Sequence, residues 1–71
     1  MLDARGWRCP LPVLRARERL SALGPGKTLE LIADDPLITL DVPAFCAQEG
    51  HELLDCREER GIWRLSIRRG G

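Results

Sequence analysis

The segment GPGKTLELIADDP, residues 24–36, decides the fold class because it isolates a buried strand between two breaks in the chain. The aliphatic run TLELIA, residues 28–33, follows the breaker GPG at 24–26 and precedes the turn signal DDP at 34–36. Helical patterns lie on both sides of this strand. Such alternation is typical of chains that pack helices on a sheet in α/β layers.

Two amphipathic helices are predicted around that strand. In the first, which begins near the prolines that follow Cys9, apolar residues recur at the spacing of one helix face: Val13, Ala16, Leu20 and Leu23. The second is expected over residues 41–49, with Asp41 as its N-cap, Pro43 in its first turn and Gly50 just after its end. The preceding residues, 37–40, are ambiguous and form either a loop or an extra helical turn.

Three further strands complete the pattern. They are predicted at residues 1–3, 51–59 and 62–68, the last two joined by a tight turn around the sequence ERG. Apolar and polar side chains alternate along 62–68, so this strand has one face in water. The order β-α-β-α-β-β, with right-handed crossovers, predicts an α/β two-layer sandwich, in which two helices cover one face of a four-stranded sheet.

The chain has 71 residues, which predicts one domain over residues 1–71 and leaves no volume for a deep cofactor cavity. No apolar run approaches the length of a membrane span, and the N-terminal residues do not resemble a signal peptide. The three cysteines, an odd number, are then expected as reduced thiols. These features predict a cytoplasmic protein without a cofactor.

The net charge is zero, but the charges are segregated along the chain. Residues 1–19 carry five arginines against two acids, whereas residues 30–59 carry nine acids against one arginine. This pattern has two readings. It is either ordinary solvated surface, or a basic N-terminal segment that favours a thiolate and attracts an acidic partner.

The candidate functional residue is Cys9, which stands directly before Pro10 in the stretch RGWRCPLPVL. Proline is favoured at the first position of a helix, which makes Cys9 the N-cap; alternatively, the helix begins at Pro12. In either case the sulfur lies at the positive end of a helix dipole, where a thiolate can accept a backbone N–H such as that of Leu11.

Neighbouring arginines strengthen this expectation. Arg5, Arg8 and Arg15 surround Cys9 in sequence, and positive charges lower the pKa of a thiol. The prediction is an ionised, water-exposed and nucleophilic sulfur. The alternative is that Cys9 is a small hydrophobic residue of the core, as free cysteines often are.

The remaining cysteines and acids are expected to be structural. Cys46 follows Phe45 on the apolar face of the second helix, and Cys56 is either a core residue or a half-exposed thiol. Asp34 and Asp35 are paired acids, expected chiefly as turn and helix-capping residues.

His51 is expected as a helix-capping residue or as the start of a strand, because it follows a glycine that ends a helix. A Cys–His catalytic pair would require it to lie near Cys9, which the sequence does not show. The spacing of histidine and cysteine residues matches no metal-binding motif, so no metal is expected. The acidic middle of the chain and the lack of an RNA-binding aromatic motif argue against nucleic-acid binding.

Four segments together resemble one protein family: LDARGWRCPLPVLRAR at 2–17, LGPGKTLELIADDP at 23–36, DVPAFCAQEGHELL at 41–54 and IWRLSIRRG at 62–70. The first is similar to the N-terminal signature of the TusA/SirA-like sulfur carriers, whose hallmark is C-P-x-P. The resemblance implies a fold like the C-terminal domain of translation initiation factor three, with sheet order 1-2-4-3 and an antiparallel fourth strand.

The resemblance also implies a function. Cys9 would carry sulfane sulfur as a persulfide, received from a cysteine desulfurase or a rhodanese-like protein and passed to a DsrE-like acceptor or to tRNA-thiolation machinery. The supporting loop would be Pro10, Leu11 and Pro12. Asp34, Asp35 and Asp41 would be structural, with docking contacts as the other reading of these aspartates. The expected protein is a carrier more than a stand-alone catalyst, monomeric when free.

Two positions depart from the family pattern. Leu11 stands where members of the tRNA relay typically have an acidic residue, and Trp7 stands where an aliphatic residue is common. Three destinations for the sulfur therefore stay open: tRNA thiolation, molybdenum cofactor supply and oxidation of reduced sulfur compounds. Two other functions also stay open, namely a protein- or RNA-interaction module and a thiol redox sensor that uses Cys9.

Overall fold

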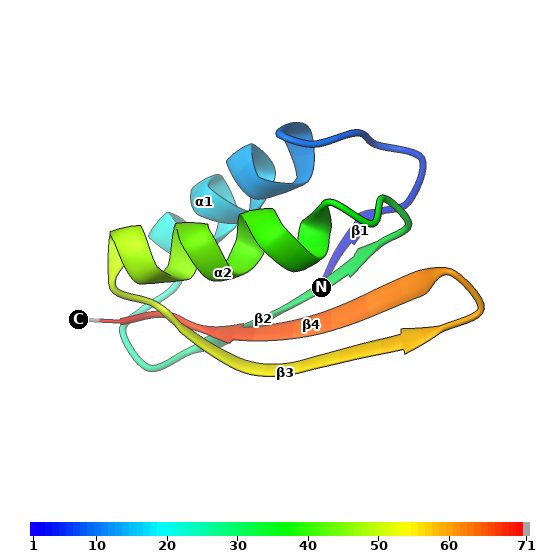
Figure 1. Cartoon of the computed structure of the whole chain (residues 1–71). Coiled ribbons are helices and arrows are strands. Elements are labelled where there is room, and N and C mark those ends of the chain that lie inside the picture. The colour runs from blue at the N-terminus through cyan, green and yellow to red at the C-terminus, as the bar shows by residue number, and fades with distance from the viewer. Residues whose placement is uncertain (71) are drawn as a thin grey trace.

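The structure is a computed structural model that describes residues 1–70, and its elements alternate in the predicted order (Figure 1). They are β1 (Leu2–Ala4), α1 (Leu11–Ala22), β2 (Thr28–Ala33), α2 (Ile38–Glu49), β3 (Glu52–Glu59) and β4 (Ile62–Arg68). β2 has the bounds that the sequence predicts for it, residues 28–33.

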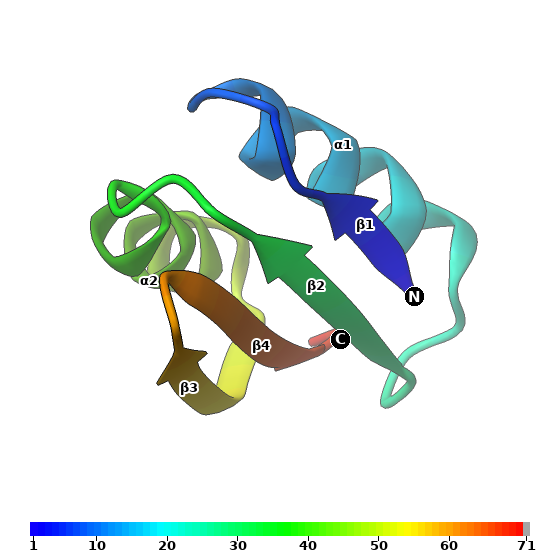
Figure 2. The ribbon, with the colours of Figure 1, turned by 90° about the vertical axis from the view of Figure 1, so that its right-hand side faces the viewer.

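The four strands form one mixed sheet in the order β1-β2-β4-β3, as the family resemblance implied. β1 runs parallel to β2, and β4 runs antiparallel to both of its neighbours. Both helices lie on the same face of this sheet, and their axes run side by side (Figure 2). The predicted two-layer sandwich is therefore confirmed.

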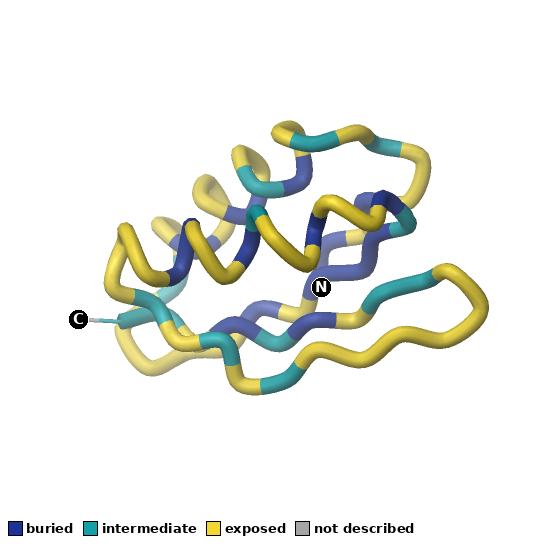
Figure 3. The backbone as a smooth tube through the Cα atoms, viewed as in Figure 1, coloured by how far each residue is buried: buried dark blue, intermediate teal, exposed yellow. Residues whose placement is uncertain are grey.

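The core lies between the helices and the sheet (Figure 3). On α1, Ala16 and Leu20 are fully buried, and Val13 and Leu23 pack against the core from its edge, as the helical spacing predicted. The other buried residues of the core come from β1, β2, α2 and β4 and include Leu31, Val42, Phe45, Leu65 and Ile67, whereas β3 adds only the partly buried Leu53. Burial of these apolar surfaces is the main stabilising contribution in a chain this small.

The start of α1 differs from the prediction. The helix begins at Leu11 with Pro10 as its N-cap, so Cys9 lies one residue before the cap and the assignment of Cys9 as N-cap is wrong. The Leu11 N–H donates to the carbonyl of Arg8 at 2.9 Å. This bond closes a turn before the helix and takes the N–H that was expected to serve the Cys9 sulfur.

The start of α2 also differs. The helix begins at Ile38, so the ambiguous residues before Asp41 do form an extra turn, and Asp41 lies within the first turn instead of at the N-cap. The reason is Asp35, whose carbonyl accepts the Ile38 N–H at 3.0 Å. Gly50 ends the helix in the left-handed conformation with φ +76°, as predicted.

The final hairpin turns at Arg60 and Gly61, which both have positive φ angles, of 55° and 81°. Two consecutive left-handed residues match the twist of the strands that they join. Along β4 the buried Leu65 and Ile67 alternate with more exposed neighbours, as predicted. Among residues 1–70, each helix falls short of the length and apolar character that crossing a lipid bilayer requires.

Core burial predicts a contrast between two leucines. Replacing the fully buried Leu20 with alanine should lower the free energy of unfolding by about 2–5 kcal/mol, because it leaves a cavity between α1 and the sheet. The matched control is Leu40→Ala, at a side chain that is 68% exposed, which should change it by no more than about 0.5 kcal/mol. Urea denaturation measures both; equal losses would contradict the core described above.

Candidate functional site

The candidate site lies at the end of the molecule where both helices begin (Figure 1). β1 and β2 are parallel, so the loops that follow them leave the same edge of the sheet. The first of these loops carries Cys9 to α1, and the second carries Asp34 and Asp35 to α2. Segments that are far apart in the sequence therefore meet around Cys9.

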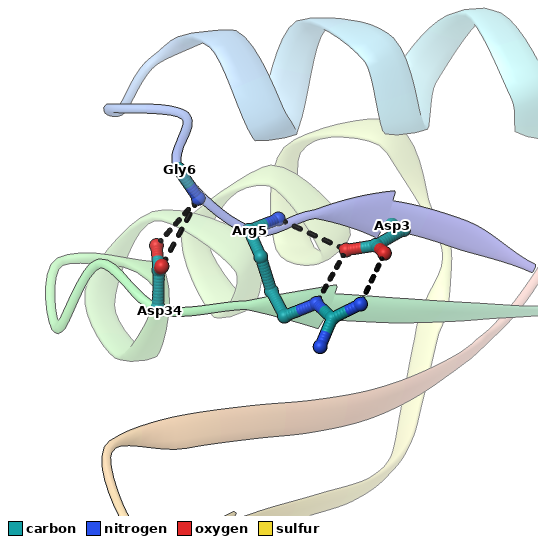
Figure 4. Close-up of polar contacts among 4 residues, drawn as sticks. All are labelled: Asp3, Arg5, Gly6 and Asp34. Atoms are coloured by element: carbon teal, nitrogen blue, oxygen red, sulfur yellow. Dashed lines mark hydrogen bonds and ion pairs between the residues drawn. The ribbon is translucent and has the colours of Figure 1, made fainter.

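Asp34 fixes the beginning of the Cys9 loop. Both of its carboxylate oxygens accept the N–H of Gly6, each at 3.0 Å (Figure 4). Gly6 has a φ of +84°, which a residue with a side chain rarely adopts. The glycine allows the turn that brings its N–H to Asp34, and the carboxylate holds the turn on the sheet edge.

Asp35 fixes Cys9 itself. Its Oδ2 accepts the Cys9 N–H at 3.0 Å, and its Oδ1 accepts the Leu37 N–H at 3.1 Å. The residue is only 6% exposed. Hydrogen bonds from these two backbone N–H groups lower the pKa of its carboxyl below the ordinary value of 3.8. One buried carboxylate thus ties Cys9 to the start of α2, so Asp35 has a structural role.

The arginines do not surround the thiol as the sequence suggested. Arg5 forms a double hydrogen bond with Asp3, at 2.9 and 2.7 Å (Figure 4), and Arg15 pairs with Glu18 at 3.1 Å. Arg8 is exposed, and its charge acts on Asp35. Arg5 and Arg15 thus have carboxylate partners of their own, and the role predicted for the three arginines beside a thiolate stays a prediction.

Carboxylates, instead, surround Cys9. The pKa of the Cys9 thiol is raised to about 12. Partial burial is the largest cause, and Asp41 and then Asp35 add to it through hydrogen bonding and negative charge. This raised pKa runs against the predicted ionised thiolate, and Cys9 is half-buried where a water-exposed sulfur was predicted. The neighbours of Cys9 in sequence are basic, but its burial in the fold is the larger cause of the raised pKa, and the acids that add to it are Asp35 of the β2–α2 connection and Asp41 of α2.

A groove between the helices opens next to Cys9. Its walls include Pro10, Val13 and Arg17 from one helix and Asp41, Phe45 and Gln48 from the other. Sequence reasoning assigned Asp41 to a helix cap, with a docking contact as its other reading, and did not place it in a groove with Pro10. The available signal was topological: two right-handed crossovers onto one sheet face make the two helices start at the same end, which brings the first turn of α2 to Cys9.

The other candidate residues lie elsewhere. Cys46 is buried, as predicted, and its burial raises the pKa of its thiol, whereas Cys56 is exposed on β3. His51 follows the C-terminal end of α2, where it packs against Phe45 with ring centroids 5.3 Å apart. Asp35 ties Cys9 to the start of this 12-residue helix, and His51 follows its other end, so about 18 Å of helix separates the two residues and no Cys–His pair forms. Residues 1–70 contain no cluster of side chains suited to holding a metal ion.

Comparison with known proteins identifies the family. Residues 1–69 match the family described as sulfurtransferase TusA. The crystal structure of a SirA-like protein from Desulfitobacterium hafniense is similar, with a TM-score of 0.85 and 25% sequence identity; the match covers 99% of this chain and 96% of that one. The chain belongs to the TusA sulfurtransferase family. It is therefore a sulfur carrier that acts with partner proteins in a sulfur relay.

The two bonds of Asp35 predict the effect of Asp35→Asn. An amide keeps the size but loses one strong acceptor, so amide hydrogen exchange at Cys9 and Leu37 should accelerate several-fold and stability should fall. The matched control, Asp55→Asn on β3, should leave both amides unchanged. Because the folded-state pKa of Asp35 is lowered, its contribution is complete above pH 3.8 and disappears as the pH falls through the lower value. Wild type and variant should then converge in acid.

The raised pKa of Cys9 predicts an unusual alkylation profile. Its reaction with iodoacetamide should keep accelerating past pH 9.0, the ordinary thiol pKa, and level off only near 12. Trypsin separates Cys9, in peptide 9–15, from the other two cysteines, in peptide 28–57, so mass spectrometry follows each site. The exposed Cys56 should react faster at neutral pH. A plateau for Cys9 at or below pH 8 would contradict the environment described above.

Proposed function

We propose that Cys9 is the residue that carries the sulfur, in the form of a persulfide. The observation that supports this proposal is the position of Cys9, since Asp35 holds its backbone at the end of the molecule where both helices begin. Of the other thiols, Cys46 is sealed in the core and Cys56 lies on an edge strand. Cys9 is half-buried on a loop that a partner can reach, and it stands in the C-P-x-P motif of the family.

The proposed transfer is a thiol-exchange reaction. The Cys9 sulfur loses its proton and attacks the outer sulfur of a persulfide on the donor, R–S–SH. The new bond joins Cys9 Sγ to that outer sulfur, while the bond between the outer and inner sulfurs breaks and leaves its electron pair on the donor. The donor thiolate takes up a proton, so the products are the Cys9 persulfide and R–SH. An acceptor thiolate then repeats the attack on the outer sulfur of Cys9.

We propose as donor a cysteine desulfurase or a rhodanese-like protein, and as acceptor a DsrE-like protein or the tRNA-thiolation machinery, in the cytoplasm. Thiol exchange needs an accessible sulfur and a partner active site, which suits a carrier more than a stand-alone catalyst. The destination of the sulfur is tRNA thiolation, molybdenum cofactor supply or sulfur oxidation. Leu11, in place of an acidic residue, favours no single one of these.

The test is sulfur uptake followed by mass spectrometry. After incubation with a cysteine desulfurase and L-cysteine, or with a rhodanese-like protein and thiosulfate, the peptide with Cys9 should gain the mass of one sulfur atom. A thiol reductant should remove it. Cys9→Ser should lose at least about 90% of the uptake, because serine forms no persulfide, whereas Cys56→Ser should retain it.

Other outcomes would replace this proposal. Sulfur found on Cys56 or Cys46 instead of Cys9 would assign the carrier role to that cysteine. Peroxide-dependent sulfenic acid on Cys9, with no sulfur uptake from either donor, would indicate a redox sensor. A Cys9→Ser variant that keeps its partners and its cellular activity would indicate an interaction module.

A further inference from the structure

β3 forms one edge of the sheet and pairs only with β4 (Figures 1 and 2). Along the other side of Glu52–Glu59, the structure of residues 1–70 places no further strand, so backbone N–H and C=O groups face outward there. Most of its side chains are exposed, among them Leu54 and Cys56. An exposed edge of this length can pair with a strand from another molecule.

The register with β4 assigns the side chains of β3 to the two faces of the sheet. Cys56 is opposite Leu65, which is buried in the core, so Cys56 belongs to the face that the helices cover. Its neighbours Asp55 and Arg57 belong to the open face, where the Arg57 Nε lies 2.7 Å from the Asp55 carboxylate. The edge thus presents a negative, a neutral and a positive side chain in succession.

Symmetry limits how a second copy of this chain can pair with that edge. In a two-fold symmetric pair of edge strands, the axis stands perpendicular to the sheet and the two strands run antiparallel. The rotation keeps every side chain on its own face of the sheet, and residues directly opposite each other also share a face. The register must therefore be centred on one residue, which lies opposite its own copy.

Charge selects among these registers. Centring on Asp55, Arg57 or Glu58 would place two like charges directly opposite each other, which destabilises a pair of strands. A centre nearer the start of β3 meets the irregularity between Leu53 and Asp55. Centring on Cys56 places two thiols opposite each other, and it brings each Asp55 opposite the Arg57 of the other copy. In this register alone β3 complements itself by charge on both sides of the axis.

We propose that β3 pairs antiparallel with β3 of a second copy, in the register centred on Cys56, so that two sheets continue as one. A contact along one strand is small beside the roughly 1,600 Å² of a standard interface, so the pair forms only in concentrated protein. The family resemblance implies a monomer when free, and the proposed pair is a departure from that expectation. The inference does not depend on the function proposed for Cys9.

Pairing through β3 leaves the candidate site accessible. β1 is at the opposite edge of the sheet from β3, and the loop with Cys9 follows β1. The combined sheet therefore has a β1 strand at each outer edge, and the two Cys9 loops lie far from the contact. Such a pair presents two copies of the loop at once.

Cross-linking at Cys56 tests the proposed register. All proteins in this experiment carry Cys9→Ser, so Cys56 is the exposed thiol and the remaining one, Cys46, is buried. A short bis-maleimide should link two copies through Cys56, and the linked fraction should rise with protein concentration. Mass spectrometry of the tryptic peptides identifies the linked residue.

Charge reversal separates specific pairing from random collision. Arg57→Asp places acids opposite each other on both sides of the axis and should lower the linked fraction about threefold or more. Asp55→Arg combined with Arg57→Asp restores the opposite charges and should restore linking. Arg19→Asp, at an exposed position of α1, changes the net charge equally and should leave linking unchanged. The rate with monofunctional N-ethylmaleimide corrects for altered thiol reactivity, and urea denaturation verifies that each variant is folded.

Sedimentation equilibrium measures the association of the wild type without any reagent. The mean mass should rise between micromolar and millimolar protein, the rise should weaken with added salt, and Arg57→Asp should stay monomeric. A wild type that is monomeric over this whole range would overturn the inference. So would linking that Arg57→Asp leaves unchanged, or that the double reversal fails to restore. Sulfur uptake on Cys9 is measured separately, so these results leave the function proposed above untouched.

Discussion

The hydrogen bonds of one buried carboxylate organise the functional end of this protein. Asp35 accepts the backbone N–H of Cys9 with one oxygen and that of Leu37 with the other, and so joins the loop after β1 to the first turn of α2. An acceptor-only side chain with two oxygens suits this task, because each N–H belongs to a different segment. The position of the Cys9 backbone and the extra turn of α2 both follow from the bonds of Asp35.

The same link gives the Cys9 sulfur a chemical environment that differs from that of many reactive thiols. Such thiols are commonly ionised by nearby cations or by a helix N-terminus. Cys9 precedes a helix, but its partial burial raises the pKa of its thiol, and the acids Asp41 and Asp35 add to this effect. A relay has a use for such a thiol: a carrier must release sulfur to its own partners and not to every small molecule that it meets.

The sequence specified the fold in some detail because its signals are local. The breaker at 24–26 and the turn signal at 34–36 fixed β2, and the alternation along 62–68 fixed β4. Boundaries failed where a distant side chain decided them. Asp41 carried the residue type of an N-cap, yet α2 starts at Ile38, because Asp35 organises the preceding turn. Aspartate is a favoured N-cap residue, but the hydrogen bond between the Ile38 N–H and the Asp35 carbonyl starts the helix three residues earlier.

The amino-acid sequence by itself determined the family, the order of the elements and the identity of Cys9 as the candidate thiol, since motifs and periodicity are properties of neighbouring residues. Only the tertiary structure decided how far that thiol is buried and which acids raise its pKa. The arginines near it in sequence extend from the loop and from α1 toward acids such as Asp3 and Glu18. The carboxylates of another segment reach the sulfur instead. Electrostatic interactions depend on distance through space and on burial, and only the folded chain sets both.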